Sequence, residues 1–160
     1  MNLRIGHGVD IHRLEAGRKC VIGGVEIESP VGPVAHSDGD VLVHALMDAI
    51  LGAQGEPDIG VKFPNNDNKY SGASSILLLE LVWKEALKRG YVLVNADMSV
   101  VCEVPKINPS SAAMKENLAR VLNVASDRIG LKATTAEKLG SLGRGEGIFA
   151  SATVLLEKKN

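Results

Sequence analysis

The sequence predicts an α/β protein, a sandwich in which a small mixed sheet carries helices packed on one face. Two long segments, residues 91–104 and 147–157, place apolar residues at every second position, as strands with one buried face do. Other segments repeat apolar residues at helical spacing. Aromatic residues make up 3% of the chain and hydrophobic residues 45%. The core must therefore be built from aliphatic side chains, which suits layers of sheet and helix.

The first half of the chain predicts two strands, a helix and a long loop, in the order 2–9, 20–28, 39–53 and 55–72. The second strand contains two consecutive glycines, which indicate a turn or a bulge. The helix has apolar residues three and four positions apart, and Ser37 or Asp38 is available as its N-cap. The loop is rich in Gly, Pro, Asn and Asp, and loops of this length are usually functional or mobile.

The second half predicts helices and strands in the order helix 74–89, strand 91–104, helix 110–122, strand 129–133 and strand 147–157. The first of these helices stops at Gly90, which suits the C′ position. Thr134 or Thr135 could cap one more helical turn through Leu139, with Glu137 near the capping-box position. We therefore expect a single domain over residues 1–160, in which three or four of these strands combine with three helices in the sandwich.

Composition excludes several classes of function. The chain has 18 Lys and Arg residues against 19 Asp and Glu residues, so no basic field is present to hold a nucleic-acid backbone. No apolar run approaches the roughly 18 residues that a membrane-spanning helix needs. Only Cys20 and Cys102 are present, and no secretory or transit pattern is visible. We therefore expect a cytoplasmic protein with no nucleic-acid or membrane partner.

Asp10, His12 and His44 are the candidate ligands of a metal ion. Asp10 and His12 are two residues apart in an extended segment, so their side chains leave on the same face. His44 belongs to a polar stripe with Asp40 and Asp48 on the first helix. That stripe either faces solvent or lies in a buried helix, where a histidine needs a partner such as a metal ion. Three N/O ligands with an open fourth position describe a catalytic zinc or similar site.

Three segments suit the binding of phosphate groups. HSDGD, residues 36–40, offers backbone N–H groups at a helix start, where the helix dipole favours an anion. KATTAEKLG, residues 132–140, offers the same with two hydroxyls, although plain helix capping would explain its threonines as well. Glu137 in that segment could hold a second cation at a diphosphate. GRGEG, residues 143–147, resembles a hairpin tip in which Arg144 is a candidate phosphate ligand.

Five segments in order resemble the 2-C-methyl-D-erythritol 2,4-cyclodiphosphate synthase family of the non-mevalonate isoprenoid pathway: GHGVDIHRL, AHSDGDVLVHALMDAILGA, DIGVKFP, ADMSVVCEVPKI and KATTAEKLGSLGRGEGI. The resemblance covers nearly the whole chain with matching spacing. It implies a homotrimer with an active site between each pair of neighbouring subunits. It also implies a divalent metal ion, Zn²⁺ or else Mn²⁺ or Mg²⁺, at Asp10, His12 and His44. A further Mg²⁺ or Mn²⁺ ion would accompany the substrate diphosphate at Glu137.

The resemblance implies a cytidine diphosphate substrate, 4-diphosphocytidyl-2-C-methyl-D-erythritol 2-phosphate, whose 2-phosphate attacks the β-phosphorus and expels CMP. His36 and Thr135 would be catalytic residues that steady the transition state, and residues 63–67 would form a mobile flap. The residues implied in substrate binding are Asp10, His12, His36, Ser37, Asp58, Ile59, Gly60, Phe63, Asp67, Cys102, Pro105, Lys106, Ile107, Asn108, Thr134, Thr135, Glu137, Ser141 and Arg144.

In this family Arg144 and Glu146 also face a cavity on the trimer axis that can hold an isoprenoid diphosphate. The sequence departs from the family pattern at Asn65, Ala136 and Ser141, none of which is an implied metal ligand. Two other functions stay open. One is a metal-dependent phosphodiesterase, in which the ion activates water. The other is a trimeric isoprenoid-binding scaffold protein, in which the metal ion is structural.

Overall fold

The computed structural model describes residues 2–64 and 72–159. The strands are β1 (Leu3–Ala16), β2 (Cys20–Ile22), β3 (Val25–Ile27), β4 (Val31–Pro33), β5 (Tyr91–Val101), β6 (Ile129–Thr134) and β7 (Gly147–Lys158). The helices are α1 (Val41–Ala53), α2 (Ile59–Lys62), α3 (Ser75–Lys88), α4 (Ser111–Leu122) and α5 (Gly140–Gly143), with 3-10 turns η2 (Asn108–Ser110) and η3 (Ser126–Arg128). None of these helices has the length and apolar character needed to cross a membrane.

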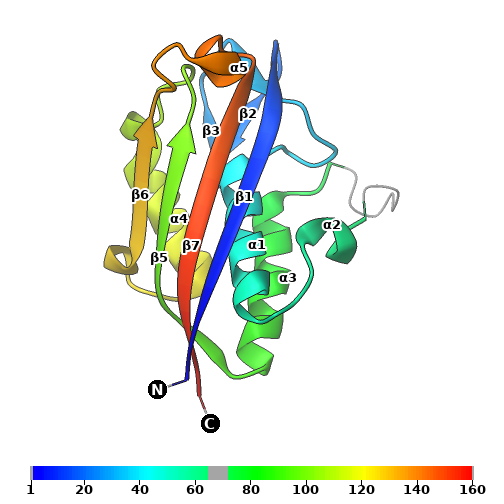
Figure 1. The fold of residues 1–160 in the computed structure, drawn as a ribbon, viewed down its shortest axis with the longest axis vertical. Coiled ribbons are helices and arrows are strands. Elements are labelled where there is room, and N and C mark those ends of the chain that lie inside the picture. Colours follow the sequence, from blue (N-terminus) through cyan, green and yellow to red (C-terminus); the bar gives the residue numbers. More distant parts are fainter. Residues whose placement is uncertain (1, 65–71, 160) are drawn as a thin grey trace.

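Five strands form the main sheet in the order β4-β1-β7-β5-β6, while β2 and β3 form a separate hairpin. β1 pairs antiparallel with β7, from Leu3 opposite Glu157 to Arg13 opposite Gly147. β5 pairs antiparallel with β7 and parallel with β6. The sheet is therefore mixed, as predicted, and α1, α3 and α4 lie on one of its faces (Figure 1).

Helix α1 lies between the sheet and α3 and is buried along nearly its whole length. The even-numbered residues of β1 from Gly6 to Leu14 lie on its buried side, and two of these are glycines. A Cβ atom added to Gly6 would lie 1.8 Å from the carbonyl oxygen of Ala49, and one added to Gly8 would lie 2.2 Å from that of Ala45. α1 therefore crosses β1 at a separation that only glycine permits.

Asp40 is the N-cap of α1, rather than the predicted Ser37 or Asp38. Its fully buried carboxylate accepts a hydrogen bond from the backbone N–H of Val43 (3.1 Å) and two more from the glycines of the β2–β3 turn (2.9 and 2.6 Å). Burial raises the pKa of Asp40 to about 6, although these three donors favour the charged form. The same carboxylate thus starts α1 and fixes the hairpin beside it.

Other predicted elements differ from the structure. β1 runs to Ala16 rather than to residue 9, because its pairing continues along β7 and then β4. The helical turn predicted through Leu139 is wrong, since Glu137 and Lys138 have left-handed φ values of 51° and 63°. The only helix start in that described segment is that of the four-residue helix α5 at Gly140, which begins after Thr134, Thr135 and Glu137. β4 was missed because it is a three-residue edge strand that contains Gly and Pro.

Replacing Gly8 with alanine should lower the free energy of unfolding by at least about 2 kcal/mol, because the new methyl group would force α1 away from β1. Gly52→Ala is the matched control. Gly52 lies within α1, and the nearest atom to its added Cβ is the carbonyl oxygen of His7 at 3.8 Å. That variant should be neutral or more stable by about 0.5–1 kcal/mol. Urea denaturation measures both, and equal stabilities would contradict the packing argument.

Candidate metal centre

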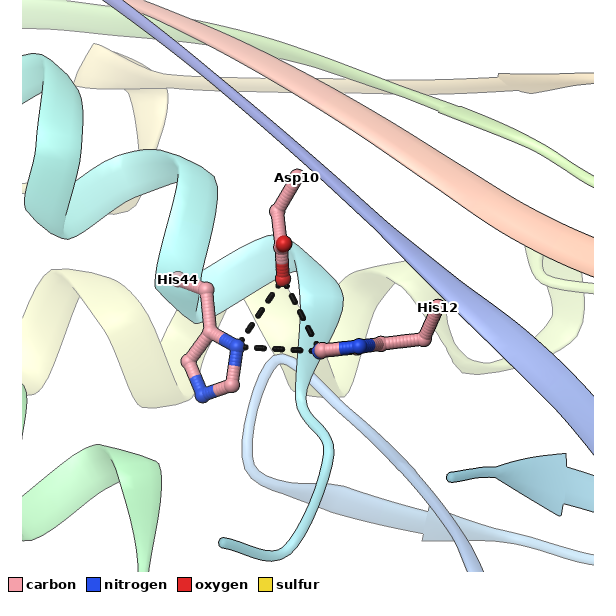
Figure 2. A group of neighbouring side chains, drawn as sticks. All are labelled: Asp10, His12 and His44. Atoms are coloured by element: carbon pink, nitrogen blue, oxygen red, sulfur yellow. Dashed lines mark hydrogen bonds and ion pairs between the residues drawn. The ribbon is translucent and has the colours of Figure 1, made fainter. Parts of the chain in front are cut away.

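Three side chains from two elements converge at the start of α1 (Figure 2). Asp10 and His12 leave the helix-facing side of β1, and His44 lies in the first turn of α1. One carboxylate oxygen of Asp10 lies 3.0 Å from His12 Nε2 and 2.9 Å from His44 Nδ1. The two ring nitrogens are 3.1 Å apart. The structure therefore brings the three predicted ligands to one point.

The donor atoms of this cluster suit a divalent metal ion. Tetrahedral zinc with ligands at about 2.0–2.1 Å separates its ligand atoms by about 3.3 Å. The three separations observed here, 2.9 to 3.1 Å, are close to that value. Two imidazole nitrogens and one carboxylate oxygen leave a fourth coordination position for an oxygen of a bound substrate.

Asp10 controls the charge of the cluster. Burial lowers the pKa of His44, but the hydrogen bond and the charge of Asp10 outweigh this effect and hold that pKa above its ordinary value. Burial raises the pKa of Asp10, but its hydrogen bonds to His12 and His44 hold it well below the usual range. Both shifts favour the charged forms, a carboxylate on Asp10 and a protonated ring on His44, so a metal ion would compete with that proton.

The polar stripe of α1 is buried, so the solvent-facing interpretation of it is wrong. Asp40 is fully buried, and His44 is 7% exposed. Asp48 is half-buried and accepts a hydrogen bond from the backbone N–H of Ile59 (2.8 Å). Each residue of the stripe therefore has a separate role. Asp40 caps α1, His44 belongs to the metal cluster, and Asp48 holds the start of α2.

Helix α2 and its two ends contain four of the predicted substrate contacts, Asp58, Ile59, Gly60 and Phe63. Asp58 is the N-cap and accepts a hydrogen bond from the backbone N–H of Val61 (3.1 Å), while Phe63 is buried at the C-cap. Because Ile59 is tied to Asp48, one turn beyond His44, α2 begins near the metal cluster. Two further residues singled out in the sequence, Asn65 and Asp67, lie outside the described residues.

The loop before α1 reaches the other side of the His44 ring. Ser37 Oγ lies 3.2 Å from His44 Nε2, whereas His36 is exposed and uses its carbonyl oxygen to accept from the backbone N–H of Gly72 (2.8 Å). Ser75 Oγ lies closer still to the same nitrogen, at 2.9 Å. No pattern in the sequence indicates this contact, because a serine is common at the start of a helix.

A second group of predicted residues lies where the parallel strands β5 and β6 end. The backbone N–H of Cys102 donates to the carbonyl oxygen of Thr134 (3.2 Å), and Thr135 Oγ1 donates to a carboxylate oxygen of Glu137 (2.8 Å). Burial raises the pKa of Cys102 to about 11, so it is a neutral thiol at neutral pH. The other members of this group are the buried Pro105 and Ile107 and the exposed Lys106 and Asn108.

The two groups lie apart within one chain. Asp10 pairs with Ala150, which pairs with Val100, which pairs with Ala133. Three strand spacings separate the ends of that row, about 14 Å at the usual spacing of about 4.8 Å. Within the part of the chain that the structure describes, no hydrogen bond joins the two groups. The family resemblance implies an active site between neighbouring subunits, and within a single copy the two groups are not in contact.

Ser141 and Arg144 lie around the turn that leads into β7. Ser141 and Glu146 line a groove of about 390 Å³ that also has His12 on its wall. Arg144 is exposed, and its Nε donates to a carboxylate oxygen of Glu146 (2.6 Å). Ser141 therefore shares this groove with His12, while the exposed guanidinium of Arg144 is paired with Glu146.

The fold and the cluster together define an α/β protein with a two-histidine, one-carboxylate candidate metal centre between a strand and a helix. The chain belongs to the YgbB family, whose family model matches residues 3–157.

Its relatives are similar over nearly their full length. A 2-C-methyl-D-erythritol 2,4-cyclodiphosphate synthase of Geotalea uraniireducens is 52% identical over 98% of this chain and 100% of its own. The protein of the same name from Pelobacter propionicus is 53% identical over 96% of this chain and 98% of its own. A solved structure of such a synthase in its CDP-bound form matches with a TM-score of 0.89 and 41% identity, over 96% of this chain and all of that chain.

The affinity of the protein for Zn²⁺ should fall as the pH is lowered, beginning at a higher pH than for an ordinary histidine site. The reason is that the raised pKa of His44 lets a proton compete with the metal ion for Nδ1. Chelator competition between about pH 8 and about pH 5.5 measures this. The variant His7→Gln, at an exposed histidine outside the cluster, should keep the same profile. A flat profile in the unmodified protein would contradict the assignment.

Proposed function

We propose that this protein converts 4-diphosphocytidyl-2-C-methyl-D-erythritol 2-phosphate into 2-C-methyl-D-erythritol 2,4-cyclodiphosphate and CMP, by metal-assisted intramolecular phosphoryl transfer. The observation that carries the proposal is the convergence of Asp10, His12 and His44 in a chain whose relatives bear the name of that synthase. The CDP-bound structure of a similar synthase supports a cytidine nucleotide as part of the substrate.

The reaction needs charge neutralisation and positioning more than it needs a protein nucleophile. The attacking 2-phosphate is already an anion, so no activated serine or cysteine is required, in keeping with the neutral thiol of Cys102. A divalent ion held by Asp10, His12 and His44 would supply positive charge beside the β-phosphate. Holding the two arms of the substrate in line can supply up to about 7–11 kcal/mol of the barrier reduction.

Among the remaining residues we propose that His36 and Thr135 stabilise the developing charge and that Glu137 holds a second ion. Glu137 offers oxygen ligands alone, which suits Mg²⁺ or Mn²⁺, whereas the imidazoles of the first site suit Zn²⁺. The hydroxyl of Thr135 orients Glu137. The other proposed substrate contacts are Ser37, Asp58, Ile59, Gly60, Phe63, Asp67, Cys102, Pro105, Lys106, Ile107, Asn108, Thr134, Ser141 and Arg144.

We also propose that the protein is a homotrimer whose copies pack through the uncovered face of the sheet. Ile5, Val9 and Ile11 point away from the helices and are 73%, 50% and 59% exposed, and an apolar surface of this kind marks an interface. A neighbouring copy would also complete the site, because the Glu137 group of one chain is too far from its own metal cluster. Arg144 and Glu146 are then candidates for binding an isoprenoid diphosphate in a cavity on the axis.

Two broader features complete the proposal. The buried side chains of the helices and strands form one hydrophobic cluster, which supports a single domain over residues 1–160. Cys20 and Cys102 are buried free thiols, which suits a reducing compartment, so we propose the cytoplasm as the location.

Asp10→Asn and His44→Ala should each abolish Zn²⁺ binding and lower CMP release by more than about 100-fold, beyond the 10–100-fold typical of residues that only support a ligand. Both variants should remain folded, since neither residue lies in the apolar core. Asp127→Asn, at an exposed carboxylate on η3, is the control and should behave like the unmodified protein. Metal analysis, circular dichroism and a CMP assay test this. Full turnover by a metal-free variant would contradict the proposal.

Reaction in H₂¹⁸O separates the cyclase from the phosphodiesterase. Intramolecular attack by the 2-phosphate incorporates no solvent oxygen, so mass spectrometry should find unlabelled CMP and cyclic product. One labelled oxygen atom in CMP, or in an open-chain bisphosphate formed in place of the cyclic product, would instead indicate that the bound ion activates water.

Ile5→Lys should dissociate the trimer, because it places a charge within the proposed apolar interface. Leu77→Lys is a matched control, since Leu77 is 58% exposed but lies on α3, on the opposite side of the sheet. Sedimentation equilibrium should give three chains for the control and one for Ile5→Lys, with CMP release lost only in the latter. A monomeric unmodified protein with full activity would refute the shared site.

A further inference from the structure

The ring of His44 makes contacts through both of its nitrogens. Nδ1 faces Asp10 and His12, as described above. Nε2 lies 2.9 Å from Ser75 Oγ and 3.2 Å from Ser37 Oγ. Ser75 is fully buried, so its hydroxyl must be satisfied by partners within the protein.

Asp38 holds Ser75 by two hydrogen bonds. The backbone N–H of Ser75 donates to one carboxylate oxygen of Asp38 (2.8 Å), and the Ser75 hydroxyl donates to the other. The carboxylate of Asp38 also accepts from the backbone N–H of Asp40 (3.2 Å). Asp38 therefore caps the start of α3 from the loop before α1, while Ser74, at the N-cap position itself, makes no side-chain capping bond.

The chemistry of the metal centre assigns a direction to these bonds. A metal ion at the cluster needs the lone pair of His44 Nδ1, so the single ring proton of a neutral imidazole must sit on Nε2. Nε2–H then donates to Ser75 Oγ, and the Ser75 hydroxyl donates to the anionic carboxylate of Asp38. Each donor in this series of hydrogen bonds therefore has an acceptor, and the last acceptor is the charged carboxylate of Asp38.

We propose that Ser75 and Asp38 are positioning residues that fix the tautomer and the orientation of His44 for metal binding. The inference rests on the proposed metal-dependent function. A carboxylate behind the hydroxyl makes Ser75 a better acceptor, which raises the electron density at Nδ1 and strengthens it as a ligand.

Two comparisons separate this role from simple helix capping. The backbone N–H of Ser75 already satisfies the capping carboxylate, so the hydroxyl is not needed to begin α3. Ser37 could offer a competing acceptor, but its distance to Nε2 is longer and its oxygen also accepts from the backbone N–H of Gly39 (3.3 Å). Ser37 donates to no carboxylate in the described structure, so Ser75 is the partner that the geometry favours.

Ser75→Ala should weaken Zn²⁺ binding about 10–100-fold, as loss of a partner behind a metal ligand typically does. Ser74→Ala is the matched control, one residue away on the same helix start, and should bind as the unmodified protein does. Asp38→Asn should also weaken Zn²⁺ binding, because the amide lacks the negative charge that polarises the Ser75 hydroxyl. Chelator competition with the purified, metal-stripped protein measures affinity, and the visible spectrum of bound Co²⁺ reports on the geometry of the ligands.

A measurement on the unmodified protein keeps the inference testable even if Ser75→Ala does not fold. In the zinc-bound protein with ¹⁵N-labelled histidine, NMR should show His44 with its proton on Nε2 and slow exchange of that proton with solvent. A proton on Nδ1, or a metal ion on Nε2, would overturn the assignment.

The possible outcomes separate this inference from the proposed function. If the unmodified protein binds Zn²⁺ and releases CMP while Ser75→Ala matches both it and Ser74→Ala in affinity, only the positioning role fails. If the unmodified protein binds no divalent ion, the proposed function fails and the positioning role fails with it.

Discussion

The close crossing of α1 over β1 is the constraint on which the metal centre depends. Two of the three candidate ligands come from the strand and one from the helix, so their spacing is set by the distance between the two backbones. Gly6 and Gly8 set that distance, because a side chain at either position would meet a carbonyl oxygen of α1. The Asp40 cap then fixes where along the strand the helix begins. The spacing of the three ligands therefore depends first on how closely the two backbones pack.

Much of this arrangement could be predicted from the sequence because it depends on local periodicity. The spacing of Asp10 and His12 in an extended segment was sufficient to place both side chains on one face. His44 was ambiguous, because a polar stripe on a helix gives no indication of what covers it. The contact between Ser75 and His44 could not be predicted, since those residues are 31 positions apart and no sequence pattern links them. The left-handed φ of Glu137 was equally hidden, because residues other than glycine rarely adopt it.

Assignments at the ends of helices failed for a related reason. Ser37, Asp38 and Asp40 are all good capping residues, so local preference cannot choose among them. Tertiary structure decides: Asp40 meets the glycines of a hairpin, and Asp38 meets the start of a helix that lies more than thirty residues further along the chain. One short loop therefore supplies the caps of both α1 and α3 and contacts the His44 ring through Ser37. Its three polar side chains have distinct tasks that only the folded chain distinguishes.

The alternation of β1 has a consequence for how the strand finds its partner. If β1 slipped by one residue against β7, Asp10 and His12 would turn outward, and Val9 and Ile11 would turn toward the helices. The slipped strand would also present the side chains of His7 and Val9 to α1, where the native alignment has only hydrogen atoms. The misaligned sheet could not pack against its central helix, so the two glycines favour the native register of β1 over the slipped one.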